Sequence, residues 1–285
     1  MNSQEMNNVF EIVRLKCKYP SNLSPVLVID KLCIERGSNT FFIGPSGVGK
    51  STILETLGLM NNTIYNSTEN NTLFTFTNTK NESIHIHELW NQKEQNIAAF
   101  RNKHLSFIFQ NTNLFKSLSA FDNIIISAIL QGKSKAEAVK RTKNIIQNIL
   151  PDVTIDKPIT ELSGGQRQRI AFARAIVSDY SVLFADEPTG NLDVGNAEKL
   201  MKILIENVES KTSIIVTHDI DLAVKFATKI VLIRNDENTN SHGLIDEQSI
   251  FLRVGNNEWT GFNKRYSSNE ISQKFKTEIF NHNSK

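Results

Sequence analysis

Short apolar runs recur along this chain, and each is about the length of one buried strand. The clearest occupy residues 39–43, 182–185 and 213–217. Continuous apolar runs of this length are typical of strands that are buried on both faces of a parallel sheet. Segments with helical composition, such as 52–57 and 135–150, lie between these runs. The alternation of strand and helix patterns predicts an α/β fold with a mixed, mostly parallel sheet.

Residues 61–96 have a different character, because they are rich in Asn, Thr and Ser and contain alternating stretches such as 72–76. The pattern predicts exposed antiparallel strands and loops. His85 and His87, followed by Glu88, suggest a metal site. The histidines alternate with isoleucines, however, and no further ligand is nearby, which favours one solvated strand face.

The C-terminal part of the chain, residues 236–285, is predicted to be an extension of the main domain. Residues 249–254 and 258–259 have strand character, and the glycine- and asparagine-containing residues 255–257 lie between them. Two such runs joined by a short turn are typical of a β-hairpin.

A helix is expected to follow this hairpin. Ser267 and Glu270 have the spacing of a capping box, and Ile271, Phe275 and Ile279 recur every four residues. An amphipathic helix that folds back on its own domain is favoured here over a regulatory or partner-binding helix.

Composition limits the class of protein. A chain of 285 residues with 39% apolar residues is large enough for one domain with a sizeable core and an appendage. Its apolar runs, such as 124–130, are far shorter than the roughly 20 residues that a membrane span needs. No basic-then-apolar signal sequence is visible, so a cytoplasmic location is expected. Cys17 and Cys33 lack metal-site spacing, and a net charge of +2 gives no support for nucleic-acid binding.

Residues 44–51 fit the phosphate-loop pattern, between a predicted strand and a predicted helix. Glycines let successive amide groups point at phosphate oxygens, and the helix N-terminus adds partial positive charge. Lys50 should reach the β- and γ-phosphates, and the Ser51 hydroxyl should bind Mg²⁺. A plain glycine-rich turn would not need the flanking strand and helix. The predicted phosphate-binding set is Gly44, Pro45, Ser46, Gly47, Gly49, Lys50, Ser51 and Thr52.

Two further motifs stand at the ends of apolar runs. Asp186 and Glu187 follow 182–185, at the edge where open α/β sheets bind their ligands. Two acids at a buried strand end are costly unless their charge is used, so Asp186 is expected to hold Mg²⁺ and Glu187 to act as general base. A solvated acidic turn would suit a polar preceding run instead. His218 ends 213–217 and is expected to contact the γ-phosphate or the attacking water.

A fourth motif is Gln110, which ends the apolar segment 107–109. The fifth motif, Leu162-Ser163-Gly164-Gly165-Gln166, lies between Gln110 and the acid pair. The five motifs in this order resemble the ATP-binding cassette (ABC) ATPases, the motor subunits of ABC transporters. The resemblance covers about residues 9–235. It implies a P-loop NTPase with a RecA-like core, an antiparallel β subdomain and a helical signature subdomain at about 111–165.

The resemblance also implies an assembly and its cofactors. In this family the signature segment faces the γ-phosphate of ATP that is bound to the other subunit of a dimer. A homodimer is therefore the expected state. ATP and Mg²⁺ are the cofactors that the resemblance implies. The resemblance implies that Ser163, Gly164, Gly165 and Gln166 form the signature, in which Ser163 and Gly165 donate hydrogen bonds to the partner's nucleotide. It implies that Tyr19 stacks on adenine and that Gln110 is both a catalytic residue and a Mg²⁺ ligand. Asp193 would communicate across the dimer interface.

Residues 188–193 are most similar to the branch of the family that contains lipoprotein-release, macrolide-export and cell-division ATPases, and residues 114–124 are similar to that branch too. The similarity implies a separate integral membrane subunit, which would hold this chain on the inner face of the membrane. Phe115, Leu118 and Phe121 either line the groove for that subunit's coupling helix or belong to the subdomain core.

Three other functions are open to an ABC ATPase. A chromosome- or repair-associated ATPase of the coiled-coil type would need a longer interval between Gln110 and Leu162. A translation factor normally carries two cassettes, whereas this chain has one set of motifs. A non-hydrolysing scaffold is disfavoured because the expected nucleotide-handling residues are all present, namely Lys50, Gln110, Glu187 and His218. Co-purification from membranes, or a neighbouring gene for a membrane protein, would distinguish transport from the rest.

Overall fold

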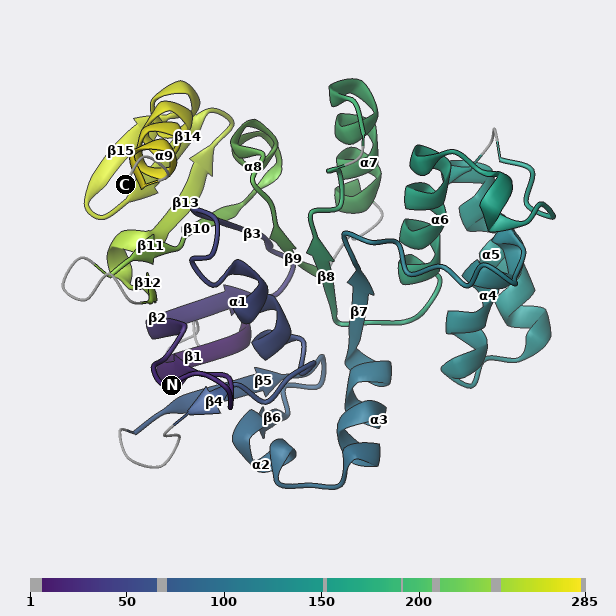
Figure 1. Cartoon of the computed structure of the whole chain (residues 1–285), viewed down its shortest axis with the longest axis horizontal. Coiled ribbons are helices and arrows are strands. Elements are labelled where there is room, and N and C mark those ends of the chain that lie inside the picture. The colour runs from purple at the N-terminus through teal and green to yellow at the C-terminus, as the bar shows by residue number, and fades with distance from the viewer. Residues whose placement is uncertain are drawn as a thin grey trace.

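The computed structural model describes residues 7–65, 71–150, 153–190, 192–206, 211–236 and 242–282. Within these residues, an eight-stranded sheet has the order β15-β14-β13-β10-β3-β9-β8-β7, and its strands β10, β3, β9, β8 and β7 are parallel (Figure 1). The parallel strands are β3 (Asn39–Ile43), β7 (Leu105–Ile108), β8 (Val182–Asp186), β9 (Thr212–Val216) and β10 (Lys229–Leu232). The predicted α/β fold with a mostly parallel sheet is confirmed.

The central strands are buried on both faces, as their apolar runs predict. In β3, Phe41 and Ile43 pack into one core cluster, whereas Phe42 packs into the other. Helix α1 (Lys50–Leu57) lies between the parallel sheet and a second sheet. Helices α7 (Val194–Glu206) and α8 (Ile220–Phe226) cover the opposite face. The carboxyl ends of β3, β8 and β9 therefore meet at one edge, beside α1.

The second sheet is the predicted antiparallel β subdomain. It has the order β11-β12-β2-β1-β5-β6, with β4 paired to β1, and only the β12–β2 pair is parallel. Its strands are β1 (Asn8–Cys17), β2 (Leu27–Glu35), β4 (Ile64–Tyr65), β5 (Leu73–Thr77), β6 (Ser83–His85), β11 (Arg234–Asn235) and β12 (Gly243–Ile245). The segment around β5 is less exposed than its composition suggests, because Phe74 and Phe76 are buried against Phe10.

The interpretation of the histidine pair as one strand face is wrong. Strand β6 ends at His85, and helix α2 (Ile86–Trp90) begins at the next residue, because Ile86 and Leu89 are buried with the three-residue spacing of a helix face. Helix α3 (Glu94–His104), which the sequence pattern did not predict, leads into β7. No group of three or more His, Cys, Asp or Glu residues that could hold a metal ion occurs in the described parts of the chain.

Three helices form a separate subdomain beside the edge strand β7 (Figure 1). They are α4 (Ala120–Leu130), α5 (Lys135–Ile149) and α6 (Gly164–Ile176), with a 3-10 turn at Ile159–Glu161. Ser119 and Ser134 cap α4 and α5 by accepting hydrogen bonds from backbone N–H groups in the first turn. Helix α6 packs on α4 and α5 and also contacts β7, so it connects this helical subdomain to the parallel sheet.

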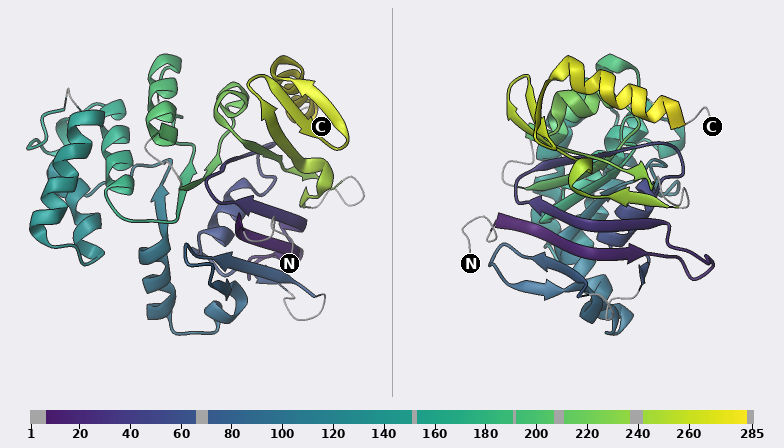
Figure 2. Two further views of the ribbon diagram at one scale, coloured as in Figure 1. Left: turned by 180° about the vertical axis from the view of Figure 1, so that it is seen from behind. Right: turned by 90° about the vertical axis from the view of Figure 1, so that its left-hand side faces the viewer.

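The C-terminal part adds strands to the parallel sheet and then a helix. After the 3-10 turn Glu247–Ser249 come β13 (Ile250–Gly255), β14 (Glu258–Gly261), β15 (Lys264–Ser267) and α9 (Ser268–His282). The β13–β14 hairpin matches the sequence pattern, whereas β15 had no signal in the sequence. Helix α9 lies over the hairpin and against α8 (Figure 2). No helix in the described ranges is long and apolar enough to cross a membrane.

Candidate active site

The phosphate loop joins β3 to α1 in the conformation that its glycines allow. Gly47 and Gly49 have φ angles of 76° and 104°, which a side chain would strain. A Cβ on Gly44 would lie 2.6 Å from the carbonyl oxygen of Ile233. No side chain caps α1 at Gly49, so its first backbone N–H groups are available to an anion. The loop therefore has the backbone geometry of a phosphate site.

Lys50 lies across this loop. Its Nζ donates to the carbonyl oxygens of Gly44 and Pro45, at 2.8 Å and 2.7 Å. Burial lowers the pKa of Lys50, and the charges of Glu187 and Asp186 oppose that shift. The ammonium group therefore lies close enough to the acid pair to feel its field, in the space between the loop and the strand ends. Of the neighbouring loop residues, Ser46 and Ser51 are exposed and Thr52 is buried.

Asp186 is the last residue of β8 and lies opposite Val216 of β9. Burial raises the pKa of Asp186, and the nearby carboxylates of Glu187 and Glu55 raise it further, while Lys50 lowers it. A divalent cation would relieve this concentration of negative charge. The donors present, a carboxylate and the exposed Ser51 hydroxyl, are hard oxygen ligands of the kind that Mg²⁺ prefers alongside phosphate and water. The site therefore fits Mg²⁺.

Glu187 and His218 form the closest side-chain pair at this sheet edge. The Nδ1 atom of His218 lies 2.8 Å from Oε2 of Glu187. The same Oε2 accepts from the Thr217 hydroxyl and from the His218 backbone N–H, both at 3.3 Å. The Glu187 side chain is only 12% exposed, whereas that of His218 is 72% exposed. One carboxylate oxygen is thus fixed, and the imidazole that fixes it faces solvent.

The backbone at Glu187 is held in an uncommon conformation. Its φ is 46°, in the left-handed region that non-glycine residues rarely occupy. The N–H of Glu187 donates to Val216 of β9 at 2.9 Å, and the N–H of Gly190 donates back to the carbonyl of Glu187 at 3.2 Å. Backbone strain of this kind concentrates at functional sites. The turn directs the Glu187 side chain toward β9 and His218.

Tyr19 lies beside the phosphate-loop helix. Its hydroxyl donates to Oε2 of Glu55 at 2.7 Å and lies 3.4 Å from the Thr52 hydroxyl. Burial, with a contribution from Glu55, raises the pKa of Tyr19 to about 12. The side chain therefore stays a neutral phenol that is attached to α1, on the same side of the molecule as the phosphate loop.

The signature residues start helix α6 and form a complete cap. The Gln166 N–H donates to Oγ of Ser163 at 3.2 Å, and the Ser163 N–H donates to Oε1 of Gln166 at 2.9 Å. Ser163 and Gly164 are exposed, and Gly165 is partly exposed. Strands β8 and β7 lie between this end of α6 and helix α1 (Figure 1). One chain therefore brings Lys50, Asp186, Glu187 and His218 together but leaves the signature apart from them.

Gln110 and Asp193 occupy two other places. Gln110 is exposed just after β7 and shares an open cleft with Gly164, Arg167 and Gln168 of α6. Asp193 caps α7, because its carboxylate accepts from the N–H and the side-chain amide of Asn196, which lowers its pKa. Asn191, in the segment quoted for the family resemblance, lies outside the described residues.

Two side chains of α6 for which the sequence predicted no role connect this helix to the strand ends. Arg174 donates to the carbonyl oxygens of Thr112 and Asn113, at 2.8 Å and 2.7 Å, just after Gln110. The buried Gln168 donates through Nε2 to the carbonyl of Pro188, next to Glu187. Polar residues on the buried side of a helix would have been the only sequence signal for them. Movement of α6 must therefore disturb both segments.

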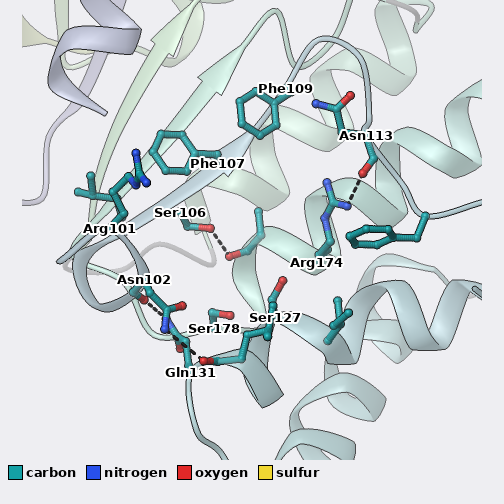
Figure 3. Close-up of a pocket in the computed structure, with 15 residues that line it drawn as sticks. Arg101, Asn102, Ser106, Phe107, Phe109, Asn113, Ser127, Gln131, Arg174 and Ser178 are labelled. Carbon is teal, nitrogen blue, oxygen red and sulfur yellow. Dashed lines mark hydrogen bonds between the residues drawn. The ribbon is translucent and has the colours of Figure 1, made fainter. Parts of the chain in front are cut away.

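A cavity of about 420 Å³ separates the helical subdomain from α3 and β7 (Figure 3). Arg101 and Arg174 line it, and Arg101 is also paired with Glu94 at 2.9 Å; no carboxylate of the described residues is part of the lining. Phe115 lines the cavity with a side chain that is 52% exposed, whereas Phe121 packs against the subdomain core. Leu118 is partly buried and does not line it. The apolar residues lining the cavity are Leu105, Phe107, Phe109, Phe115, Ile126, Leu130 and Ala175.

The fold and these residues define a nucleotide-binding P-loop cassette, and comparison with known proteins identifies the family. A family model described as "ABC transporter" matches residues 29–190. The chain is 36% identical over 204 residues to the lipoprotein-releasing system ATP-binding protein LolD of Syntrophus aciditrophicus. The aligned region covers 70% of this chain and 85% of that protein. The chain belongs to the ABC transporter family.

Two solved structures agree. The first is the dimeric, post-hydrolysis structure of an ATP-binding cassette bound to ADP and Pi, to which this chain has 28% sequence identity. The TM-score is 0.63, and the match covers 78% of this chain and 93% of the other. CbiO1 from Clostridium perfringens, part of the transporter complex cbiONQ, is 22% identical, with a TM-score of 0.70 over 97% of this chain and 94% of the other. The second likeness shows the fold alone. The family binds ATP with Mg²⁺ and hydrolyses it, and its subunits work with membrane proteins.

Proposed function

We propose that two copies of this chain hydrolyse ATP between them and drive a separate membrane subunit of a transporter or mechanotransmission complex. The observation that carries this proposal is the position of the signature. Ser163 and Gly164 form an exposed, capped helix start that lies away from the phosphate loop of its own chain. In a head-to-tail pair, each signature would meet the phosphate loop of the other copy and so complete two sites.

Within each site, the phosphate loop and Lys50 would hold the β- and γ-phosphates. Lys50 now donates to loop carbonyls, so bound phosphate would replace those two acceptors with charged ones. Tyr19 would place its ring against adenine. Ser51, Gln110 and Asp186 would hold Mg²⁺, which when bound stabilises the developing charge on the phosphate oxygens.

Glu187 is the proposed general base for the attacking water. Its Oε2 is fixed by His218 and Thr217, which leaves the second carboxylate oxygen to take the proton. His218 would orient Glu187 and, because it is exposed, could also donate to the γ-phosphate. From the partner copy, Ser163 and Gly165 would donate hydrogen bonds to the same phosphate, aided by the N-terminus of α6.

The closed dimer would bind ATP better than the open dimer does, and hydrolysis would remove that difference in affinity. Asp193, at the start of α7, would carry the state of one site to the other. Arg174 and Gln168 would transmit the same change to the helical subdomain, because they connect α6 to the segments after Gln110 and Glu187. The subdomain would then move with the nucleotide state.

The cavity beside Phe115 is the proposed docking site for the membrane subunit. Its aromatic lining and its two arginines suit an amphipathic cytoplasmic helix that carries a carboxylate. Docking there would place this chain on the inner face of the membrane and next to the segment that follows Gln110. Movements of the helical subdomain would reach the partner directly.

Replacing the general base tests this function. Glu187→Gln keeps the hydrogen-bonding shape but cannot accept a proton, so the variant should bind ATP and Mg²⁺, hydrolyse ATP at least about 100-fold more slowly and elute as a stable dimer. A variant that hydrolyses ATP at the wild-type rate, or stays monomeric with saturating ATP and Mg²⁺, would contradict the proposal.

A further inference from the structure

His218 lies between the end of β9 and the start of helix α8. The helix begins at Ile220, and its N-cap is Asp219, whose Oδ1 accepts from the N–H of Leu222 at 2.9 Å. His218 immediately precedes that cap. A helix of seven residues has few hydrogen bonds of its own, so contacts from outside determine where it lies. His218 is therefore held by β9 on one side and by α8 on the other, and a shift of α8 would move the imidazole relative to Glu187.

Arg253 of β13 holds the C-terminal end of α8. Its Nε donates to the carbonyl of Ala227 at 2.7 Å, and its terminal nitrogen donates to Lys225 at 3.2 Å and to Val224. The last carbonyl groups of a helix have no partner within the helix, and a cation there also opposes the negative end of the helix dipole. Arg253 satisfies two of these carbonyls, on Val224 and Lys225, and also that of the C-cap residue Ala227.

The Arg253 side chain is itself fixed by the hairpin. Its guanidinium lies 4.6 Å from the centre of the Trp259 ring on β14 and also donates to the carbonyl of Asn256 at 2.9 Å. Trp259 is fully buried. The N–H donors of the Arg253 guanidinium are thus positioned by β13 and β14 rather than by α8.

Helix α9 contacts the other end of α8. Asp221, in the first turn of α8, accepts from the Ser272 hydroxyl at 2.8 Å and from Nζ of Lys276 at 2.7 Å. These groups are largely exposed and contribute little by themselves. The buried side of α9 contributes more, because Ile271 and Phe275 belong to the same core cluster as residues of α8. The C-terminal part therefore fixes both ends of α8.

We infer that β13, β14 and α9 position His218 for hydrolysis, and that Arg253 is the residue through which they do so. This inference rests on the proposed function, because it gives the C-terminal part a role in the same site. Without Arg253 the end of α8 would lose three hydrogen bonds, and the imidazole would no longer be held at one distance from Glu187. Binding of ATP, which depends on the phosphate loop and Tyr19, would change little.

The test is a kinetic comparison of wild type, Arg253→Lys and Arg253→Ala. Arg253→Ala should lower kcat about tenfold, since small displacements of catalytic groups have effects of this order, and should leave KM for ATP within about twofold. Arg253→Lys keeps a donor of similar length and should lie between them. If Arg253→Ala does not fold, Arg253→Gln takes its place in the series. Equal kcat values across the series, or a loss confined to KM, would overturn the inference.

A double-mutant cycle shows whether Arg253 acts through His218. In a His218→Ala background, adding Arg253→Ala should lower kcat by less than about twofold, because the group being positioned is already absent. Losses that multiply would mean general destabilisation and would overturn the inference. An inactive wild type would contradict the proposed function itself, whereas active wild type with unaffected Arg253 variants would contradict only this inference.

Discussion

The Nδ1 atom of His218 lies 2.8 Å from Oε2 of Glu187, and this contact joins the ends of β9 and β8. In the proposed function, this contact orients the carboxylate that acts as general base. His218→Ala should therefore lower kcat by about 100-fold while ATP still binds. Thr217→Val removes a longer contact of 3.3 Å to the same oxygen and is the matched control, with a smaller loss. Steady-state ATPase assays compare the two, and a larger loss in Thr217→Val would contradict the assignment.

Lys50 is the cation of the phosphate loop, and its ammonium group has only loop carbonyls as acceptors among the described residues. Lys50→Ala should weaken ATP binding by at least about 100-fold, because charged hydrogen bonds to two phosphates are lost. Lys50→Arg keeps the charge with a different shape and should recover part of the affinity. Titration with a fluorescent ATP analogue measures this, and unchanged affinity in Lys50→Ala would refute the role.

Asp186 is the residue whose replacement should stabilise the protein in the absence of ligand. Burial and Glu187 raise its pKa, so the folded state binds its proton more tightly than the unfolded state does. The contribution of Asp186 to the free energy of unfolding is thus present at low pH and is lost as the pH rises through the raised pKa. Asp186→Asn should melt higher than wild type at pH 8, and the gap should narrow toward pH 4. A gap that widens on acidification would contradict this prediction. Normal Mg²⁺-dependent ATPase activity in the variant would instead contradict the proposed role of Asp186 as a Mg²⁺ ligand.

Phe115 tests the docking site. Phe115→Ala should reduce by at least about fivefold the amount of the chain that sediments with membranes, because aromatic residues in pockets often dominate interface energy. Phe262→Ala is the matched control, since Phe262 is 58% exposed, close to the 52% of Phe115, but lies in the C-terminal part. Quantitative blotting of membrane fractions gives the result. Equal sedimentation of both variants would place the membrane contact elsewhere.

The central strands and the order of the motifs could be predicted from the sequence because their signals are local and strong. In β8 the residues Val182–Ala185 are fully buried, so the apolar run alone defines the strand. The acid pair directly follows the apolar run of β8, and His218 comes two residues after the last apolar residue of β9. Topology then brings them to one edge, since parallel strands end on the same side of a sheet.

Other features depend on contacts between distant residues and left little local signal. The alternation around His85 suits a strand, but a helix starts there because Ile86 and Leu89 are buried together on one helix face. Strand β15 is an edge strand made of polar residues, so only pairing with β14 defines it. The hydrogen bonds that connect Arg174 to the segment after Gln110, Gln168 to Pro188 and Arg253 to the end of α8 join residues that are 20 to 62 positions apart. No pattern within one element could predict them.

The most direct test of the account is a structure of the Glu187→Gln variant with ATP and Mg²⁺. The account predicts a two-fold dimer in which the Ser163 hydroxyl of each copy lies about 3 Å from the γ-phosphate bound by the other copy. A structure with ATP on the phosphate loop, in which Ser163 and Gly165 of every copy lie far from any phosphate, would contradict it.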